Sequence, residues 1–215
     1  MPSSHSRRWP RSSSPSAHRR AGATDPTQLV LLGFLAVGLA GGLLSGGRLT
    51  ALGEVQLRWW ALAVGGLLVQ IVLFSAPVAN IVGQAGALLY VGSMALVLAV
   101  LVRNLDQPWL RVVALGAGLN LLVIAVNGGV MPVDPSAFVA AGLSSAPAGT
   151  FSNTAPIAHA PLWFLGDVIA TPAWVPFANV LSVGDLLIGV GAAGWIAAAM
   201  QRERPPIFVR SVARP

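Results

Sequence analysis

One imidazole and three carboxylates are the groups best suited to chemistry within residues 112–201, a stretch without any Arg or Lys. They are His159, Asp134, Asp167 and Asp185. Groups of these types can bind a divalent cation or transfer protons. Their spacing does not enforce a site, because there is no His-x-x-x-His or Glu-x-x-His pair and no acid next to His159. We therefore expect no metal site, and an enzyme with His159 as general base is the least favoured function.

Asp185 has two competing interpretations. It stands in "SVGDLLIGVG", about one turn inside an apolar segment, where an acid is costly and often functional. However, Ser182-x-x-Asp185 also has the spacing of a helix capping box, and the helix dipole favours an acid in the first turn. Both interpretations stay open at this point.

The stretch "NGGVMPVDP", residues 127–135, follows a long apolar run. Asn-Gly-Gly supplies left-handed residues for a helix end, and Pro132 prevents the helix from continuing. Two consecutive glycines would also expose backbone groups at membrane depth, which the wall of a pocket could satisfy. The candidate ligand-binding residues are therefore Asn127, Gly128, Gly129, His159, Asp167 and Asp185.

Other residues in the apolar segments predict contacts between helices. Asn120 lies seven residues before Asn127, so both share one helical face, and interhelical hydrogen bonds explain such a stripe. Gly38, Gly42 and Gly46 recur every four residues and predict a smooth face for helix packing. The same face could serve a second copy of the chain or another membrane protein.

The composition places these residues in a membrane protein. Of 215 residues, 55% are hydrophobic and only 9% are charged, whereas an ordinary soluble domain carries about 25% charged residues. The net charge of +6 does not indicate nucleic-acid binding, because the basic residues lie in the tails and at the ends of apolar runs. There is no Cys, which excludes disulfides and thiol chemistry.

Five apolar segments are long enough to cross the roughly 30 Å hydrocarbon layer. They are residues 28–47, 59–76, 84–102, 109–130 and 181–200. The predicted fold is an all-α membrane bundle of about five transmembrane helices with a long re-entrant or interfacial outer loop. Residues 1–28 are predicted to be a disordered Arg/Ser/Pro-rich tail, 29–200 the transmembrane domain, and 201–215 a cytoplasmic Arg-rich tail.

The distribution of arginine predicts the orientation. The connections 48–58 and 103–111 and the tail after residue 200 carry Arg, whereas 77–83 and 131–180 carry none. We expect the C-terminus in the cytoplasm and loop 131–180 outside a bacterial plasma membrane, since the use of Arg without Lys is typical of a GC-rich genome. Five spans then leave the N-terminal tail outside despite its five Arg, so either its start is annotated too far upstream or the helix count is wrong by one.

The outer connection, residues 131–180, is too long to be a mere connector. Asp134-Pro135 predicts a capped short helix over 135–142, and 144–155 is predicted to be a flexible polar tip. Residues 156–177 are apolar but broken by proline, so we expect them in the outer interface or folded back, with Trp163 and Trp174 as interfacial anchors.

Several elements resemble one known family. "NGGVMPV" at 127–133, "LGD" at 165–167, "PFANVLSVGDLLIGVG" at 176–191 and "GGRL" at 46–49 are similar to the bacterial membrane proteins grouped as domain of unknown function 5317. The resemblance covers about residues 29–200. It implies a shared membrane fold and no established activity, substrate or cofactor.

Three functions stay open from the sequence. The first is binding or movement of a small solute or cation in a polar pocket at the outer face, formed by the candidate residues named above. The second is a non-catalytic interaction or assembly protein that uses the Gly38–Gly46 face. The third is a membrane enzyme, and a stable bundle whose polar motifs only cap and pack helices is the alternative to all three.

Overall fold

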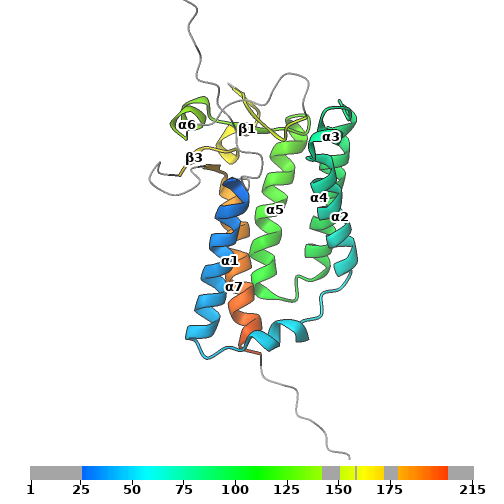
Figure 1. Cartoon of the computed structure of the whole chain (residues 1–215). Helices are drawn as coiled ribbons and strands as arrows, with labels where there is room; N and C mark the ends of the chain where they lie inside the picture. Colours follow the sequence, from blue (N-terminus) through cyan, green and yellow to red (C-terminus); the bar gives the residue numbers. More distant parts are fainter. Residues whose placement is uncertain (1–25, 142–150, 158, 172–178, 203–215) are drawn as a thin grey trace, which may run out of the picture.

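The computed structural model describes residues 26–141, 151–157, 159–171 and 179–202 (Figure 1). Helices dominate the described chain, and short strands join them at one end. The elements are α1 (Pro26–Leu44), η1 (Leu49–Glu54), α2 (Trp60–Leu73), α3 (Ala76–Ala79), α4 (Ala85–Arg103), α5 (Pro108–Val126), β1 (Met131–Val133), α6 (Pro135–Ala140), β2 (Thr154–Pro156), η2 (Trp163–Leu165), β3 (Ile169–Ala170), β4 (Val180–Leu181) and α7 (Val183–Met200).

The longer helices run side by side in the spatial order α1, α7, α5, α4 and α2 (Figure 1). The last helix of the chain, α7, packs between α1 and α5. Helix α4 packs against both α5 and α2, so α2 lies at the edge of the bundle. The order in space therefore differs from the order in sequence.

Three of these helices, α4, α5 and α7, are long and apolar enough to cross a membrane. The apolar part of α1 over Leu32–Leu44 and the whole of α2 are shorter. Large apolar side chains on the edge helix point outward, and they include Leu67, Leu68, Ile71 and Val72, each at least half exposed. A continuous apolar surface of this kind is suited to lipid contact and unsuited to water.

Two glycines of α1 let this helix approach α7 closely. A Cβ atom at Gly38 would lie 2.7 Å from the Ala193 backbone, and one at Gly42 would lie 2.5 Å from the Met200 sulfur. Gly46 differs from the predicted stripe, since it lies beyond the end of α1 with φ of +79° and no neighbour within 4 Å of an added Cβ. Its role is to turn the chain.

The chain between α5 and α7 folds over one end of the bundle, which we call the cap end (Figure 1). Strand β1 pairs in parallel with β2, with Met131 opposite Thr154. Strand β3 pairs antiparallel with β4, and a bridge between Val133 and Asp167 links the two pairs. The predicted short helix is present as α6, capped by Asp134.

Part of the predicted flexible tip is instead anchored. The ring of Phe151 stacks on Phe74 with 5.6 Å between centroids, and its backbone N–H donates to the Ala79 carbonyl at 2.8 Å. A Cβ atom at Gly86 would lie 2.8 Å from this ring, so the glycine makes room for it. The prediction was wrong for residues 151–155 because Phe151 buries its ring against the bundle. Residues 142–150 and Trp174 lie outside the described chain.

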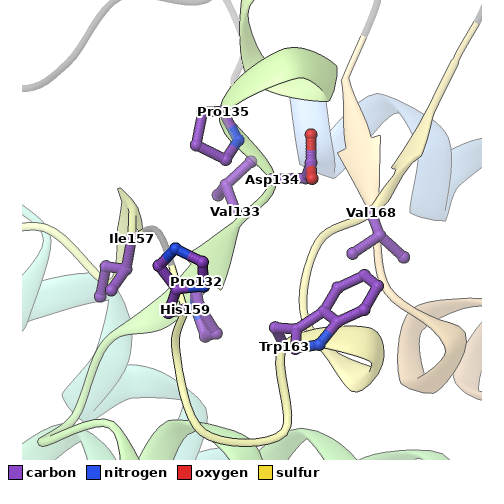
Figure 2. Close-up of a pocket in the computed structure, with 8 residues that line it drawn as sticks. All are labelled: Pro132, Val133, Asp134, Pro135, Ile157, His159, Trp163 and Val168. Carbon is purple, nitrogen blue, oxygen red and sulfur yellow. The ribbon is translucent and has the colours of Figure 1, made fainter.

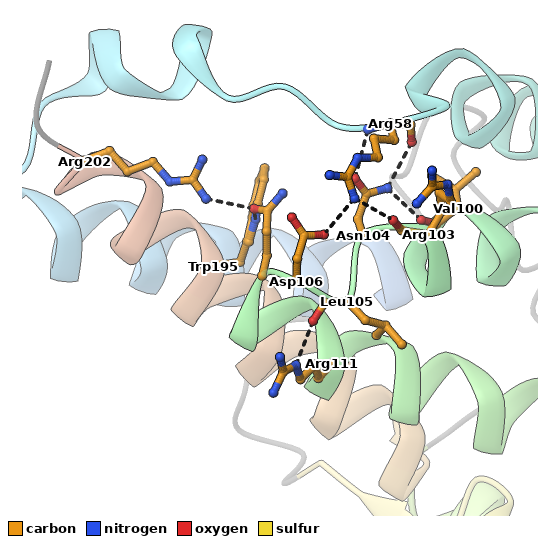
Figure 3. A network of polar contacts seen from close by, with 10 residues as sticks. Arg58, Val100, Arg103, Asn104, Leu105, Asp106, Arg111, Trp195 and Arg202 are labelled. Carbon is orange, nitrogen blue, oxygen red and sulfur yellow. Dashed lines mark hydrogen bonds and ion pairs between the residues drawn. The ribbon is translucent and has the colours of Figure 1, made fainter. Parts of the chain in front are cut away.

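The opposite end of the bundle, which we call the arginine end, gathers the arginines of separate segments (Figure 3). The backbone of Arg48 donates to the Met200 carbonyl at 2.8 Å, which joins the start of η1 to the end of α7. Arg202 donates to Gln107 at 3.1 Å, and Arg58 forms an exposed ion pair with Asp106 at 3.4 Å. The remaining described arginines of this end are Arg103 and Arg111.

Two amides that the sequence did not single out hold this end together. The Asn104 side chain, only 2% exposed, accepts from the Arg58 N–H at 2.9 Å and donates to the carbonyls of Arg58 and Val100. Gln107 accepts from the indole of Trp195 at 2.6 Å (Figure 3). Their position at the ends of apolar runs could have indicated a structural role, because a buried amide there must find hydrogen-bond partners.

Candidate functional site

The polar centre of the cap end begins at the start of α7. Ser182 accepts from the Asp185 N–H at 2.9 Å, and Asp185 accepts from the Ser182 N–H at 2.9 Å, which completes the predicted capping box. Asp185 also accepts from the Asn120 side chain of α5 at 2.8 Å, and the Ser182 hydroxyl donates to the Asn120 amide oxygen at 3.0 Å. The capping box is therefore one half of an interhelical network.

Two glycines make this network possible. A Cβ atom at Gly184 would lie 1.9 Å from the amide oxygen of Asn120 and 2.8 Å from the Gly116 carbonyl. A Cβ atom at Gly116 would lie 2.5 Å from the Gly184 carbonyl. The sequence Ser-x-Gly-Asp at 182–185 thus has a physical reason at each named residue, since Ser and Asp cap the helix and Gly lets Asn120 reach both.

Asp167 reaches the same end of the bundle from the cap. Its backbone N–H donates to the Pro132 carbonyl and its carbonyl accepts from the Asp134 N–H, both at 2.9 Å. Gly166 before it passes so near Pro132 that a Cβ would lie 2.4 Å from the Pro132 carbonyl oxygen. The backbone of Asp167 is therefore fixed to β1, which decides where its side chain lies.

The residue Asp167 is largely buried, and its carboxyl group, which is not completely closed off from solvent, receives no hydrogen bond within the described chain. The residue is 9% exposed, and no side chain or backbone group of the described chain donates to it. Burial and, as the smaller cause, the nearby negative charge of Asp185 together raise the pKa of Asp167 to about 8. Ionisation of Asp167 in this place is therefore costly, and a proton or a cation beside it would lower that cost.

The candidates Asn127, Gly128 and Gly129 form a helix cap. The Gly129 N–H donates to the Ile124 carbonyl at 2.8 Å and the Gly128 N–H to the Ala125 carbonyl at 3.3 Å, with φ of +90° and +70°. These two bonds are the Schellman pattern.

The Asn127 side chain is also already used. It donates to the Val123 carbonyl at 2.8 Å and to the Pro161 carbonyl at 3.0 Å, which ties the cap to α5. No hydrogen bond of the described chain joins it to Asp167 or Asp185. The structure thus places Asn127, Gly128 and Gly129 in a helix cap, without a hydrogen bond to either acid.

His159 lies apart from the two acids. It is exposed, has a left-handed φ of 59°, and lines a separate pocket of about 310 Å³ in the cap (Figure 2). The other lining residues are Pro132, Val133, Asp134, Pro135, Ile157, Trp163 and Val168. Neither Asp167 nor Asp185 belongs to this pocket. Within the described chain no three His, Cys, Asp or Glu side chains come together as a metal site.

Asn153 is a cap residue that sequence reasoning missed. Its amide donates to the Tyr90 hydroxyl of α4 at 3.3 Å, and its carbonyl accepts from the Met131 N–H at 2.7 Å. It stands in a segment expected to be a flexible tip. The only sequence signal was the lone Tyr90 in an apolar helix, whose hydroxyl needs a partner.

The fold and the two ends define the class of the protein. It is a helical membrane protein of the multi-pass type, with three helices long and apolar enough to cross a bilayer, an end rich in arginine and an end whose described charged residues are all acids, of which Asp167 is buried. More particularly, residues 54–197 match the sequence profile of the family of unknown function DUF5317, and the chain belongs to that family.

The matched range extends from the end of η1 to near the end of α7 and includes Asn120, Asp167 and the Ser182–Asp185 box. Helix α1 and "GGRL" at 46–49 precede it, so the match is narrower than the resemblance that the sequence elements indicate. No curated protein and no solved structure matches the chain.

Proposed function

We propose that this membrane protein binds a proton or a small monovalent cation at the acid pair formed by Asp167 and Asp185. The observation that carries the proposal is the largely buried residue Asp167, whose carboxyl group receives no hydrogen bond within the described chain and feels the negative charge of a second acid, Asp185. The Asn120 side chain and the Ser182 N–H donate to Asp185, and no hydrogen bond of the described chain joins either of them to Asp167.

The charge distribution supports a cation over an anion. No Arg or Lys occurs in residues 112–201, whereas three acids do. An anion at this end would meet only negative charge, and a proton or a monovalent cation would relieve the repulsion between the two acids. The site is less suited to a divalent metal. Within the described chain no third His, Cys, Asp or Glu side chain joins the two carboxylates, so the coordination shell would be incomplete.

The orientation follows from the same distribution. We place the cap end outside the plasma membrane and the arginine end in the cytoplasm. The acid pair then faces the exterior, where a proton or cation can reach it. The interaction or assembly alternative loses its sequence argument, because Gly38 and Gly42 pack against α7 of the same chain.

The test is a sodium titration of the purified full-length protein at pH 9, followed by thermal unfolding. Since Asp167 is ionised above its pKa of about 8, sodium should stabilise the fold at pH 9 and not at pH 6, where a proton occupies the site. A tenfold excess of sodium over Kd would add about 1.4 kcal/mol, or a rise in Tm of about 3 °C.

Asp167→Asn should abolish the sodium effect, and Asp106→Asn, a matched loss of one exposed acid at the arginine end, should retain it. If the Tm of the natural protein responds neither to sodium at pH 9 nor to acidification from pH 9 to 6, the acid pair binds neither a cation nor a proton as proposed. A sodium effect that survives in Asp167→Asn would equally contradict the site.

A further inference from the structure

The pocket lined by His159 and Trp163 is distinct from the acid pair. It holds about 310 Å³ and lies between β1, the start of α6 and the segment around η2 (Figure 2). Val168 lines it, whereas Asp167 does not. Successive side chains of an extended segment point to opposite sides, so the pocket and the acid pair lie on opposite faces of this segment.

One wall of the pocket carries a fixed negative charge. The Asp134 carboxylate accepts from the N–H groups of Ser136 at 2.8 Å and Ala137 at 3.0 Å, and from the Ser136 hydroxyl, all through one oxygen. The hydroxyl of Ser136, followed by the Ala137 N–H, lowers the pKa of Asp134, so the group is ionised at neutral pH. Its second oxygen receives no hydrogen bond from the described chain.

The opposite wall is aromatic. Trp163 is 57% exposed and lines the pocket with its indole ring, held edge to face against Phe164 at 6.3 Å between centroids (Figure 2). The electron-rich face of an indole attracts cations. The remaining lining is prolyl and aliphatic, apart from the imidazole of His159. The pocket thus offers an anion, an aromatic ring and apolar walls.

We propose that this pocket binds a small organic cation, an alkyl- or benzylammonium with an apolar body. The ammonium group would lie between Asp134 and Trp163, and the apolar body against Pro132, Val133 and Ile157. A ligand with a phosphate group is disfavoured, since residues 112–201 contain no Arg or Lys to neutralise it. The proposal therefore commits to a free ammonium compound rather than a phospholipid headgroup.

The test measures binding of benzyltrimethylammonium to the purified full-length protein by calorimetry. Neopentylbenzene, in which carbon replaces the charged nitrogen, is the neutral probe of the same shape. The natural protein should bind the cation and bind the neutral probe much more weakly. Equal affinity for the two probes would overturn the proposal, because it would show a merely apolar cavity.

Asp134→Asn is the decisive variant, since Asn is as good a helix N-cap as Asp and keeps α6 capped while it removes the charge. It should weaken binding about tenfold, within the range expected for one charge near the protein surface. Trp163→Leu should weaken it about threefold through loss of the cation–π contact, and Trp163→Phe should restore most of that loss.

Two controls test where on the protein the cation binds and whether the ligand is a free ammonium compound or a lipid headgroup. Asp106→Asn removes the same charge at the arginine end and should leave the affinity within about twofold, as expected for a distant, screened charge. Phosphocholine should bind more weakly than choline, and tighter binding of phosphocholine would assign the pocket to a lipid headgroup and overturn the proposal. The proposal would also be overturned if Asp134→Asn bound benzyltrimethylammonium with unchanged affinity while its Tm was unchanged.

Discussion

At the scale of single residues, two acids 33 positions apart in the chain have opposite environments. Asp134 is surrounded by donors, which lower its pKa, whereas Asp167 is buried without one and its pKa is raised to about 8. The first acid is therefore a permanent charge at neutral pH. The second changes its protonation within the physiological range, so its effect on stability must depend on pH.

Asp167→Asn tests that dependence. Below the pKa of an unfolded Asp, about 3.9, both states of the natural protein are protonated at this residue and no penalty exists. Between about pH 4 and 8 the unfolded state ionises while the folded state keeps its proton, so stability falls as pH rises and stays low above pH 8. In the absence of added sodium, the Asp167→Asn protein should not show this decrease in stability between about pH 4 and 8.

The gain in the free energy of unfolding from Asp167→Asn should be near zero at pH 4 and reach at most about 6 kcal/mol at pH 9. Thermal unfolding of both proteins across this pH range measures it. Parallel pH profiles for the two proteins would show that Asp167 ionises as freely in the folded state as in the unfolded state.

At the scale of elements, the contact between α5 and α7 determines whether the polar centre exists. Gly116 and Gly184 let the two backbones approach, and Asn120 fills the remaining space by bonding to Ser182 and Asp185. In lipid, where apolar surface gives no drive for helix association, such close packing and hydrogen bonding hold helices together.

Gly184→Ala should therefore destabilise the bundle. The added Cβ would lie 1.9 Å from the Asn120 oxygen, so α5 must move away and the bond to Asp185 must lengthen. We expect a loss of about 1–3 kcal/mol in unfolding free energy, the usual range for overpacking. Gly118→Ala in α5, the helix that Gly184 of α7 packs against, is the matched control, because an added Cβ there has no neighbour within 4 Å.

Alanine at position 118 should be neutral or stabilise by up to about 1 kcal/mol through helix propensity. Unfolding of both variants in detergent, followed by circular dichroism, gives the comparison. Equal stability of the two variants would mean that α5 and α7 do not meet at this distance.

At the scale of the whole molecule, charge is segregated between the two ends. The arginine end carries Arg48, Arg58, Arg103, Arg111 and Arg202 with Glu54 and Asp106, and the described cap end carries acids without Arg or Lys. By the positive-inside rule, the end that carries the arginines faces the cytoplasm. The asymmetry therefore predicts the orientation of the protein in the membrane.

Single cysteines test the orientation, since the natural chain has none. Ala140→Cys on α6 should react with a membrane-impermeant maleimide in intact bacterial spheroplasts, because this exposed position lies at the cap end. Gly53→Cys in η1, exposed at the arginine end, should react only after lysis. The reverse pattern would place the acid pair on the cytoplasmic side.

The sequence by itself determined the apolar helices, the arginine asymmetry and the local caps at Asp134, Ser182 and Asn127. Each depends on residues near one another in the chain, since a helix in lipid must satisfy its own backbone and a cap acts within a few residues. Only the tertiary structure decided that α7 lies between α1 and α5 and that Phe151 anchors the cap. It also decided that the charge of Asp185 acts on Asp167 while Asn127 bonds elsewhere, and that Asp134 and Trp163 share a pocket. These are contacts between distant segments, and they depend on which surfaces fit together, a property that no local pattern encodes.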